Sequence, residues 1–280
     1  MEEKYLDFAI GIADYAGITM RKYFNRDMDV ERKEDNTPVT LVDKQINSYL
    51  IEQVKKKFPN HGVYGEEEKY NEKSEYLWVC DPVDGTSMYI RHIPVSVFSL
   101  ALVIDGEPIV GVVYDPFLNE IYTSIKGRGA FCNSKKINVD EKVFGDFGCV
   151  VDVCMWNKAK YDTLDLLKEI RKEVKLTQMG SVARACMAVA SGKISAEVFP
   201  GTIHGNCDVA ASKLIVEEAG GVVTDFHGND QRYDVDIDGA IITNKKINKM
   251  MLKKVRDIYG NWLWWIKRRF NGLFWNSNGI

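Results

Sequence analysis

The spacing of apolar residues predicts two long helices near the start of the chain. Between residues 5 and 24, apolar or small residues recur at intervals of three and four, namely Leu6, Ile10, Ala13, Gly17, Met20 and Phe24. This spacing is typical of one face of an amphipathic helix. A second helix is expected over residues 41–57, with Ile46, Leu50 and Val54 facing inward and Pro59 following its end.

After Tyr76 the pattern changes to short apolar runs separated by Gly and Asp, which predicts strands. Strands are expected at 77–80, 95–104, 108–114, 120–125, 150–153, 174–177, 195–199 and 239–243. Asp105–Gly106 is a typical two-residue hairpin turn. Helices are expected at 161–172, 182–190, 208–219 and 246–259, and Gly220–Gly221 is a helix stop.

This order of elements predicts a layered α+β fold with two packed lobes. We expect a single domain over residues 1–260, with an N-terminal α+β lobe of about 1–150 and a C-terminal α/β lobe of about 151–260. A chain of 280 residues with 45% hydrophobic residues can bury a sizeable core. At 28% charged and 11% aromatic residues, the composition excludes a disordered protein.

Charge and cysteine usage narrow the class of protein. The 37 Lys and Arg nearly balance the 40 Asp and Glu, which argues against nucleic acid as a partner, because binding a phosphate backbone needs a basic excess. The chain shows neither a signal-peptide pattern nor an apolar run long enough to span a membrane, so a cytoplasmic location is expected. The six Cys are expected as reduced thiols, and the scattered His predict no zinc site.

Acidic residues gather where two of the apolar runs end. Glu66 follows the run 62–64, and Asp81 and Asp84 follow the run 77–80 without a Lys or Arg up to Ile90. Carboxylates at the end of a buried strand are costly unless a positive charge meets them. Oxygen ligands without a basic neighbour are what Mg²⁺ prefers, and the carbonyl of Val83 is available beside them.

The residues after these acids suggest an anion site. Gly85, Thr86 and Ser87 offer backbone N–H groups and two hydroxyls at the expected start of a short helix. Acids followed at once by a phosphate site indicate metal-assisted hydrolysis of a phosphate ester. The alternative is that Asp-Pro-x-Asp-Gly simply ends a strand in a turn. A phosphatase with an aspartyl nucleophile is disfavoured, because two residues separate Asp81 from Asp84, whereas that class has one.

Three motifs in order resemble the inositol monophosphatase family, part of the Mg²⁺-dependent, lithium-sensitive phosphatase superfamily. They are Gly65–Glu66–Glu67, Asp81–Pro82–Val83–Asp84–Gly85–Thr86, and Asp208–Val209–Ala210–Ala211 with Glu218–Ala219–Gly220–Gly221. The likeness covers roughly residues 5–258. It implies an αβαβα sandwich, a homodimer, two to three Mg²⁺ ions for which Mn²⁺ can substitute, inhibition by Li⁺ and Ca²⁺, and water as the nucleophile.

The resemblance also assigns expected roles. The metal ligands would be Glu66, Asp81, the carbonyl of Val83, Asp84 and Asp208. Thr86, with Asp43 as its partner, would orient and deprotonate the attacking water, while Glu66 would face a third ion near Lys33. Phosphate or substrate would meet Gly85, Thr86, Ser87, Gly180 and Ser181. Glu67 and Glu68 are expected as supporting or surface acids.

This sequence departs from the family pattern at several positions. Ser87–Met88–Tyr89 follows Thr86, and Cys207 precedes Asp208 where Trp is common. The stretch 200–206 offers no carboxylate, whereas members that bind inositol place a Glu there, so inositol itself is in doubt. Arg91 and His92 could meet a second anionic group, although a surface position is favoured.

The last nineteen residues hold four of the six Trp, outside the resemblance. Trp262, Ile266, Phe270 and Leu273 form one helical stripe beside a basic cluster. Two interpretations stay open for a tail of 261–280. It is a packing arm against the body or a second subunit, which is favoured, or an interfacial helix on an anionic membrane.

The sequence therefore predicts a Mg²⁺-dependent phosphomonoesterase acting on a small polyol, sugar or cyclitol phosphate. Fructose-1,6-bisphosphatase or 3'(2'),5'-bisphosphate nucleotidase activity is the alternative within enzymes. A catalytically silent assembly or regulatory protein that binds through its tail is the alternative from another class. The intact set Glu66, Asp81, Asp84, Thr86 and Asp208 argues against this last alternative.

Overall fold

The computed structural model describes residues 2–26, 30–32, 38–156 and 159–260. The C-terminal tail and Lys33 lie outside the described residues, so their expected roles stay predictions. Within the described part, no helix is long and apolar enough to cross a membrane. All six Cys are free thiols, and every one but Cys132 is buried, which agrees with the reduced thiols predicted from the sequence.

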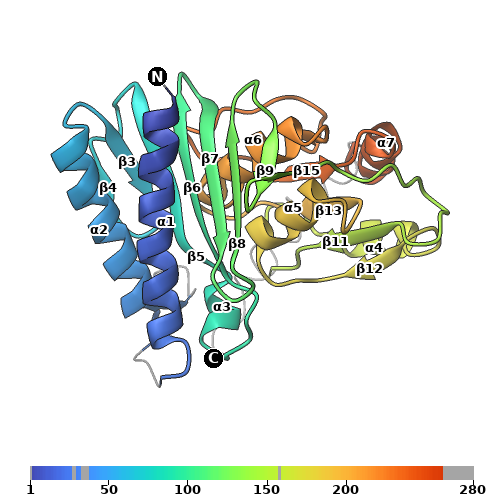
Figure 1. The fold of residues 1–280 in the computed structure, drawn as a ribbon. Helices are drawn as coiled ribbons and strands as arrows, with labels where there is room; N and C mark the ends of the chain where they lie inside the picture. Colours follow the sequence, from blue (N-terminus) through green and yellow to red (C-terminus); the bar gives the residue numbers. More distant parts are fainter. Residues whose placement is uncertain (1, 27–29, 33–37, 157–158, 261–280) are drawn as a thin grey trace, which may run out of the picture.

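The described elements stack in five layers, helix–sheet–helix–sheet–helix (Figure 1). The helices are α1 (Glu3–Tyr23), α2 (Leu41–Lys57), α3 (Thr86–Tyr89), α4 (Leu164–Ile170), α5 (Val182–Ala190), α6 (Gly205–Glu218) and α7 (Asn248–Tyr259). The pair α1 and α2 covers the outer face of the first sheet, α5 and α6 fill the space between the sheets, and α4 and α7 cover the second sheet. The predicted αβαβα sandwich is confirmed.

The first sheet has eight strands among the described residues and is mostly antiparallel. Their order across the sheet is β10 (Lys135–Lys136), β9 (Ala130–Cys132), β8 (Glu120–Ile125), β7 (Glu107–Asp115), β6 (Val97–Ile104), β5 (Tyr76–Asp84), β3 (Gly62–Gly65) and β4 (Lys69–Tyr70). Strands β3 and β5 run parallel. Asp105 and Gly106 join β6 to β7 with φ of 51° and 82°, which is the predicted hairpin turn.

The second sheet has five described strands, in the order β12 (Lys175–Thr177), β11 (Val150–Val153), β13 (Ala196–Phe199), β15 (Ala240–Thr243) and β14 (Val222–Thr224). Strand β11 pairs in parallel with β12 and β13, because helices connect these strands. The sequence pattern missed β14, which has only three residues. A separate small sheet pairs β1 (Val30–Arg32) with β2 (Pro38–Thr40).

The buried face of helix α1 overlaps the predicted one but is wider. Ala13, Gly17 and Met20 of the predicted stripe are buried, whereas Leu6 and Ile10 are only half-buried at its margin. The buried face also includes Phe8, Ala9 and Ile12, because α1 packs on both the first sheet and α2. In α2 the predicted residues Ile46, Leu50 and Val54 are all fully buried.

We expect Gly17→Ala to destabilise the protein, because α1 lies closest to the first sheet at this glycine. A Cβ atom at residue 17 would lie 2.2 Å from Cε1 of Tyr114. Displacing that ring should lower the free energy of unfolding by about 1–3 kcal/mol. Gly11→Ala is the matched control on the same helix: Gly11 has nothing within 4 Å of the added atom, and Ala should stabilise by about 0.5–1 kcal/mol.

Urea denaturation of the two variants measures both effects. Equal changes in the free energy of unfolding for the two variants would contradict this account of how α1 packs.

Candidate active site

Two buried aspartates lie at the C-terminal end of β5. The sequence analysis placed Asp81 and Asp84 after the strand, but β5 runs through both of them to Asp84. Their exposed fractions are 2% and 5%. The pairing of β5 with β6 shifts register between Asp81 and Asp84, which is typical of a β-bulge. The amide of Val83 donates to Oδ1 of Asp81 at 2.9 Å within this irregular segment.

The Asp84 carboxylate also binds the N-terminus of α5. Its Oδ2 accepts the hydroxyl of Ser181 at 2.7 Å and the amide of Ala183 at 2.6 Å, and its Oδ1 accepts the amide of Val182 at 3.3 Å. A helix N-terminus stabilises a negative charge through its unpaired N–H groups. Ser181 therefore contacts Asp84 through its side chain, a link across the two halves of the chain that the sequence analysis did not foresee.

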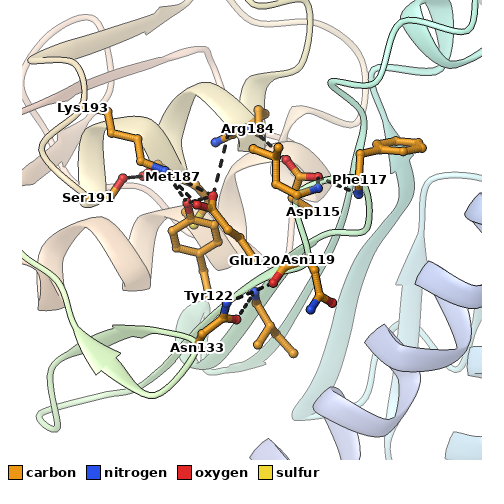
Figure 2. A network of polar contacts seen from close by, with 12 residues as sticks. Asp115, Phe117, Asn119, Glu120, Tyr122, Asn133, Arg184, Met187, Ser191 and Lys193 are labelled. Atoms are coloured by element: carbon orange, nitrogen blue, oxygen red, sulfur yellow. Dashed lines mark hydrogen bonds and ion pairs between the residues drawn. The ribbon is translucent and has the colours of Figure 1, made fainter.

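An ion-pair network holds α5 against the first sheet (Figure 2). Nε of Arg184 lies 2.9 Å from Oδ2 of Asp115, a fully buried residue at the end of β7. In the same network, Oε1 of Glu120 lies 3.1 Å from Nζ of Lys193, and Oε2 of Glu120 accepts a hydrogen bond from the hydroxyl of Tyr122 at 2.6 Å. Since Arg184 directly follows Ala183 in the first turn of α5, this network helps to fix the donors around Asp84.

Asp208 completes a group of three carboxylates. It lies in the first turn of α6, where the helix dipole favours an acid. Helix α6 begins at Gly205, earlier than predicted, so Asp208 is inside the helix. Ligand atoms of Asp81, Asp84 and Asp208 all lie within 4.8 Å of one another.

Burial and mutual repulsion perturb these acids. Burial, together with the charges of Glu66, Asp84 and Asp208, raises the pKa of Asp81 well above its usual range. Burial raises the pKa of Asp84 to about 6, although the donors from Ser181, Ala183 and Val182 act in the opposite direction. The cluster thus holds more negative charge than its protein surroundings compensate.

Glu66 lies beside this cluster but is not one of the three grouped carboxylates. The parallel pairing of Gly65 with Cys80 places Glu66 next to Asp81, and the amide of Glu66 donates to the carbonyl of Cys80 at 3.0 Å. Asn47 of α2 supports the following turn, because it donates to the carbonyl of Glu68 at 3.0 Å and accepts from two amides of the turn. Sequence reasoning missed Asn47, although a polar residue four positions after Asp43 in an apolar stripe was a usable signal.

Thr86 and Asp43 are in contact. The hydroxyl of Thr86 lies 3.3 Å from Oδ1 of Asp43 and 2.9 Å from the carbonyl oxygen of Val83. Asp43 is fully buried in the first turn of α2, where its Oδ2 accepts the amide and hydroxyl of Thr40 in a capping box. The capping box fixes the carboxylate that faces Thr86.

The expected phosphate-contacting residues come from two loops that meet. Gly85 has a φ of 89°, and a Cβ atom there would lie 3.0 Å from the carbonyl oxygen of Gly180 and from Cβ of Ser181. Ser96, which the sequence analysis missed, donates to the carbonyl of Gly85 at 2.9 Å. Ser87 is half-buried on α3, and its carbonyl accepts Arg91. Residue 85 must therefore be glycine for two reasons: its φ is positive, and the backbone of Gly180 lies too close to leave room for a side chain.

The flanks of the site carry a His–Tyr pair and the exposed residues Arg91 and His92. His204 precedes α6 with a φ of 63°, and its Nδ1 lies 3.2 Å from the hydroxyl of Tyr64. Arg91 and His92 are exposed and contact the carbonyls of Ser87 and Phe24 respectively. The surface position favoured for Arg91 and His92 agrees with these contacts.

The donor chemistry of the carboxylate cluster fits Mg²⁺. Three aspartates from β5 and α6 supply oxygen ligands only, which is the ligand type that Mg²⁺ prefers, and within the described residues no Lys or Arg forms an ion pair with Asp81 or Asp84. A bound cation would offset the repulsion that raises the pKa of Asp81. Oxygen ligands beside the Thr86–Asp43 contact and the Gly85 turn are the arrangement expected of a metal-dependent phosphoric monoester hydrolase.

Comparison with known proteins establishes the family. The chain belongs to the inositol monophosphatase family, whose family model matches residues 1–259. It is 30% identical to "Inositol monophosphatase 3" of Solanum lycopersicum, over 91% of this chain and 97% of that protein. It is also 30% identical to the "Fructose-1,6-bisphosphatase/inositol-1-monophosphatase" of Thermotoga maritima, over 90% and 96%.

A solved structure confirms the fold of the family. The Thermotoga maritima IMPase superposes with a TM-score of 0.83 at 30% identity, covering 92% of this chain and 98% of that one. The protein is thus a metal-dependent phosphatase.

We expect Mg²⁺ to raise the Tm more at about pH 8 than at about pH 5. The folded-state pKa of Asp84 is raised to about 6, so its contribution to stability is fully present below the unfolded value and is lost as the pH rises through about 6. The metal-free protein therefore carries the cost of this buried charge at high pH, where a cation relieves it. At low pH a proton already occupies the site, and Mg²⁺ must displace it.

Differential scanning calorimetry with chelator and with Mg²⁺ at both pH values measures this gain in Tm. Asp84→Asn should reduce the pH dependence of the gain. A gain that is equal at both pH values in the unaltered protein would contradict the assignment of Mg²⁺ to these acids.

Proposed function

We propose that this protein hydrolyses the monoester of a small sugar, polyol or cyclitol phosphate, with Mg²⁺ as its cofactor. The observation that carries the proposal is the group of Asp81, Asp84 and Asp208 next to the Thr86–Asp43 contact. Family membership supports the reaction class.

In this proposal the acids hold the cation and the neighbouring residues place the reactants. Asp81, Asp84, Asp208, Glu66 and the carbonyl of Val83 would be the metal ligands. When bound, Mg²⁺ would neutralise negative charge on the phosphoryl oxygens and lower the pKa of a coordinated water molecule. The backbone of Gly85 and Ser87, with Gly180 and Ser181 opposite, would face the phosphate.

The Thr86 hydroxyl would handle the proton of the attacking water. Its single hydrogen is shared between two acceptors, the carbonyl of Val83 and the carboxylate of Asp43. When Thr86 donates to Asp43, its own lone pairs can accept a hydrogen bond from water. The protein then needs no covalent nucleophile, since positioning and electrostatics supply most of the rate enhancement.

The proposal extends to the number of metal ions, the inhibitors, the oligomeric state and the location of the protein. Following the family resemblance, we propose two to three Mg²⁺ ions per site, with Mn²⁺ as a substitute, inhibition by Li⁺ and Ca²⁺, a homodimer and a cytoplasmic location.

The residues before Asp208 bear on the choice of substrate. Residues 200–206 carry no carboxylate to accept hydrogen bonds from ring hydroxyls. His204 lies next to Tyr64 on this side, so the stretch presents an imidazole and a phenol instead. Asp236 does approach the stretch, but it accepts the amide of Gly205 at 3.0 Å and lies 3.3 Å from Nζ of Lys160. We therefore expect inositol phosphate to be a poorer substrate than open-chain or furanose phosphates.

A second candidate is activity on a bisphosphate, such as fructose 1,6-bisphosphate or a nucleoside 3',5'-bisphosphate. It is favoured by the same lack of an acid at 200–206, since an acid there would repel a second phosphate. The name of the Thermotoga maritima relative joins fructose-1,6-bisphosphatase and inositol-1-monophosphatase activity in one protein.

Phosphate release from a panel of esters tests the proposal. The panel should contain inositol 1-phosphate, glycerol phosphate, fructose 1,6-bisphosphate and a nucleoside 3',5'-bisphosphate, each with Mg²⁺ and with chelator. We expect turnover that disappears with chelator, and a higher kcat/KM for a non-inositol ester. Absence of turnover on every ester by folded, Mg²⁺-loaded protein would overturn the enzymatic function and favour the assembly role.

A further inference from the structure

A second cluster of ligand-type side chains lies inside the molecule, on the second sheet. Asp152 of β11 pairs directly with Glu197 of β13, and Cys154 follows Asp152 by two positions. Paired residues and residues two apart on a strand point to the same face of a sheet. The exposed fractions are 0%, 0% and 1%, and ligand atoms of the three residues all lie within 4.8 Å of one another.

The two acids are short of hydrogen-bond donors. Among the described residues, no backbone amide, hydroxyl or basic side chain donates a hydrogen bond to either oxygen of Glu197 or to Oδ2 of Asp152. The groups within hydrogen-bonding reach of Glu197 are the other two members of the cluster, the carboxyl of Asp152 and the thiol of Cys154. The amide of Met179 donates to Oδ1 of Asp152 at 2.8 Å. Two fully buried carboxyl groups that face each other are unusual, because desolvation of a carboxylate is costly unless a cation or a shared proton meets it.

A further acid near the cluster adds to the negative charge around Glu197. Asp84 is close enough to raise the pKa of Glu197 further, after burial and after Asp152. Among the described ion pairs, none brings a Lys or Arg to Asp152 or Glu197, and the closest basic group on α5, Arg184, is engaged by Asp115. Two buried acids and a thiol that converge without a basic partner among the described residues therefore point to a ligand of positive charge.

We propose that Asp152, Cys154 and Glu197 bind one divalent transition-metal ion of the Zn²⁺ type, apart from the catalytic Mg²⁺ site. Zn²⁺ accepts thiolate and carboxylate ligands together, whereas Mg²⁺ prefers oxygen ligands alone. Three protein ligands leave the fourth tetrahedral position to water or another donor. The proposal does not depend on the proposed function.

The position of the site suggests what the ion does. The amide of Met179 that binds Asp152 lies two residues before Ser181, and Ser181 donates to the catalytic candidate Asp84. An ion at Asp152 would brace the turn that carries Gly180 and Ser181. This role is structural, because the three residues of the cluster are fully buried. Cys and His spacing in the sequence did not indicate this site, since two of its ligands are acids on different strands.

Titration with Co²⁺ tests the proposal, because a cysteine thiolate bound to Co²⁺ gives a charge-transfer absorption in the near ultraviolet. The full chain is stripped with chelator, kept reduced and free of oxygen, and titrated in saturating Mg²⁺ so that the catalytic acids are occupied. We expect the absorption to saturate at one Co²⁺ per chain and to disappear when Zn²⁺ is added.

Two cysteine variants assign the absorption to a site. Cys154→Ser should abolish it. Cys207→Ser is the matched control, since Cys207 is the buried thiol that lies next to Asp208, and it should keep the absorption. An absorption that survives in Cys154→Ser, or that Cys207→Ser abolishes, would overturn the proposal, because Co²⁺ would then be bound elsewhere.

A third variant avoids dependence on the cysteine. Glu197→Gln keeps the size of the side chain, and we expect it to weaken Co²⁺ binding at least about tenfold and to lose the rise in Tm that Zn²⁺ gives the unaltered protein. Near-ultraviolet circular dichroism confirms that each variant is folded. If the folded, unaltered protein shows neither the absorption nor a Zn²⁺-dependent Tm, the proposal is wrong, and the two acids are a pair that shares a proton.

Discussion

Asp84→Asn is expected to lower kcat/KM by about 10³-fold or more while the protein stays folded. Asp84 is one of three carboxylates gathered within 4.8 Å, and an amide in its place removes the negative charge that binds the cation. The amide oxygen can still accept from Ser181 and Ala183 at the N-terminus of α5. Loss of the charge weakens these hydrogen bonds, but it also removes the cost of a buried carboxylate.

These two effects on stability oppose each other, so the free energy of unfolding should change by no more than about 1–2 kcal/mol. Asp105→Asn is the matched control: Asp105 lies in an exposed hairpin turn, where Asn also tolerates a φ of 51°. Steady-state kinetics on the preferred ester and urea denaturation measure both quantities. Near-normal turnover by Asp84→Asn would remove this residue from the metal site.

Sequence patterns predicted an element well where its capping residues and its apolar spacing indicate the same boundaries. Helix α2 runs from Leu41 to Lys57 as expected, because the Thr40 capping box and a single apolar stripe define it. Helix α4 is shorter than the predicted 161–172, since Tyr161 leaves the helix to stack on Phe226 with ring centroids 4.0 Å apart. The buried face of α1 was predicted only in part, because local periodicity does not show that the helix packs on both the first sheet and α2.

The candidate site likewise contains residues that the sequence predicted and contacts that it did not predict. Asp81, Asp84 and Thr86 are neighbours in the chain, so their chemistry was visible as a motif. The contact of Ser181 with Asp84 depends on how α5 packs against the first sheet, and no local pattern encodes it. The pairing of Asp152 with Glu197 likewise follows from strand order in the second sheet.

Thr86→Ala is expected to lower kcat by about 10²–10⁴-fold and to change KM far less. The hydroxyl of Thr86 contacts Asp43 and the carbonyl of Val83, not the three grouped carboxylates, so its removal should leave the metal ligands in place. An interaction that handles the proton of the water acts mainly in the transition state, which is why kcat falls and substrate binding is spared.

Thr86→Ser separates this role from packing, since it keeps the hydroxyl and removes only a methyl group. We expect Thr86→Ser to recover most of the activity and Thr86→Val, which keeps the shape without the hydroxyl, to resemble Thr86→Ala. Asp43→Asn is less informative, because Asp43 also accepts the amide and hydroxyl of Thr40 in the capping box of α2. A Thr86→Val variant with the kcat of the unaltered protein would show that the hydroxyl takes no part in the reaction.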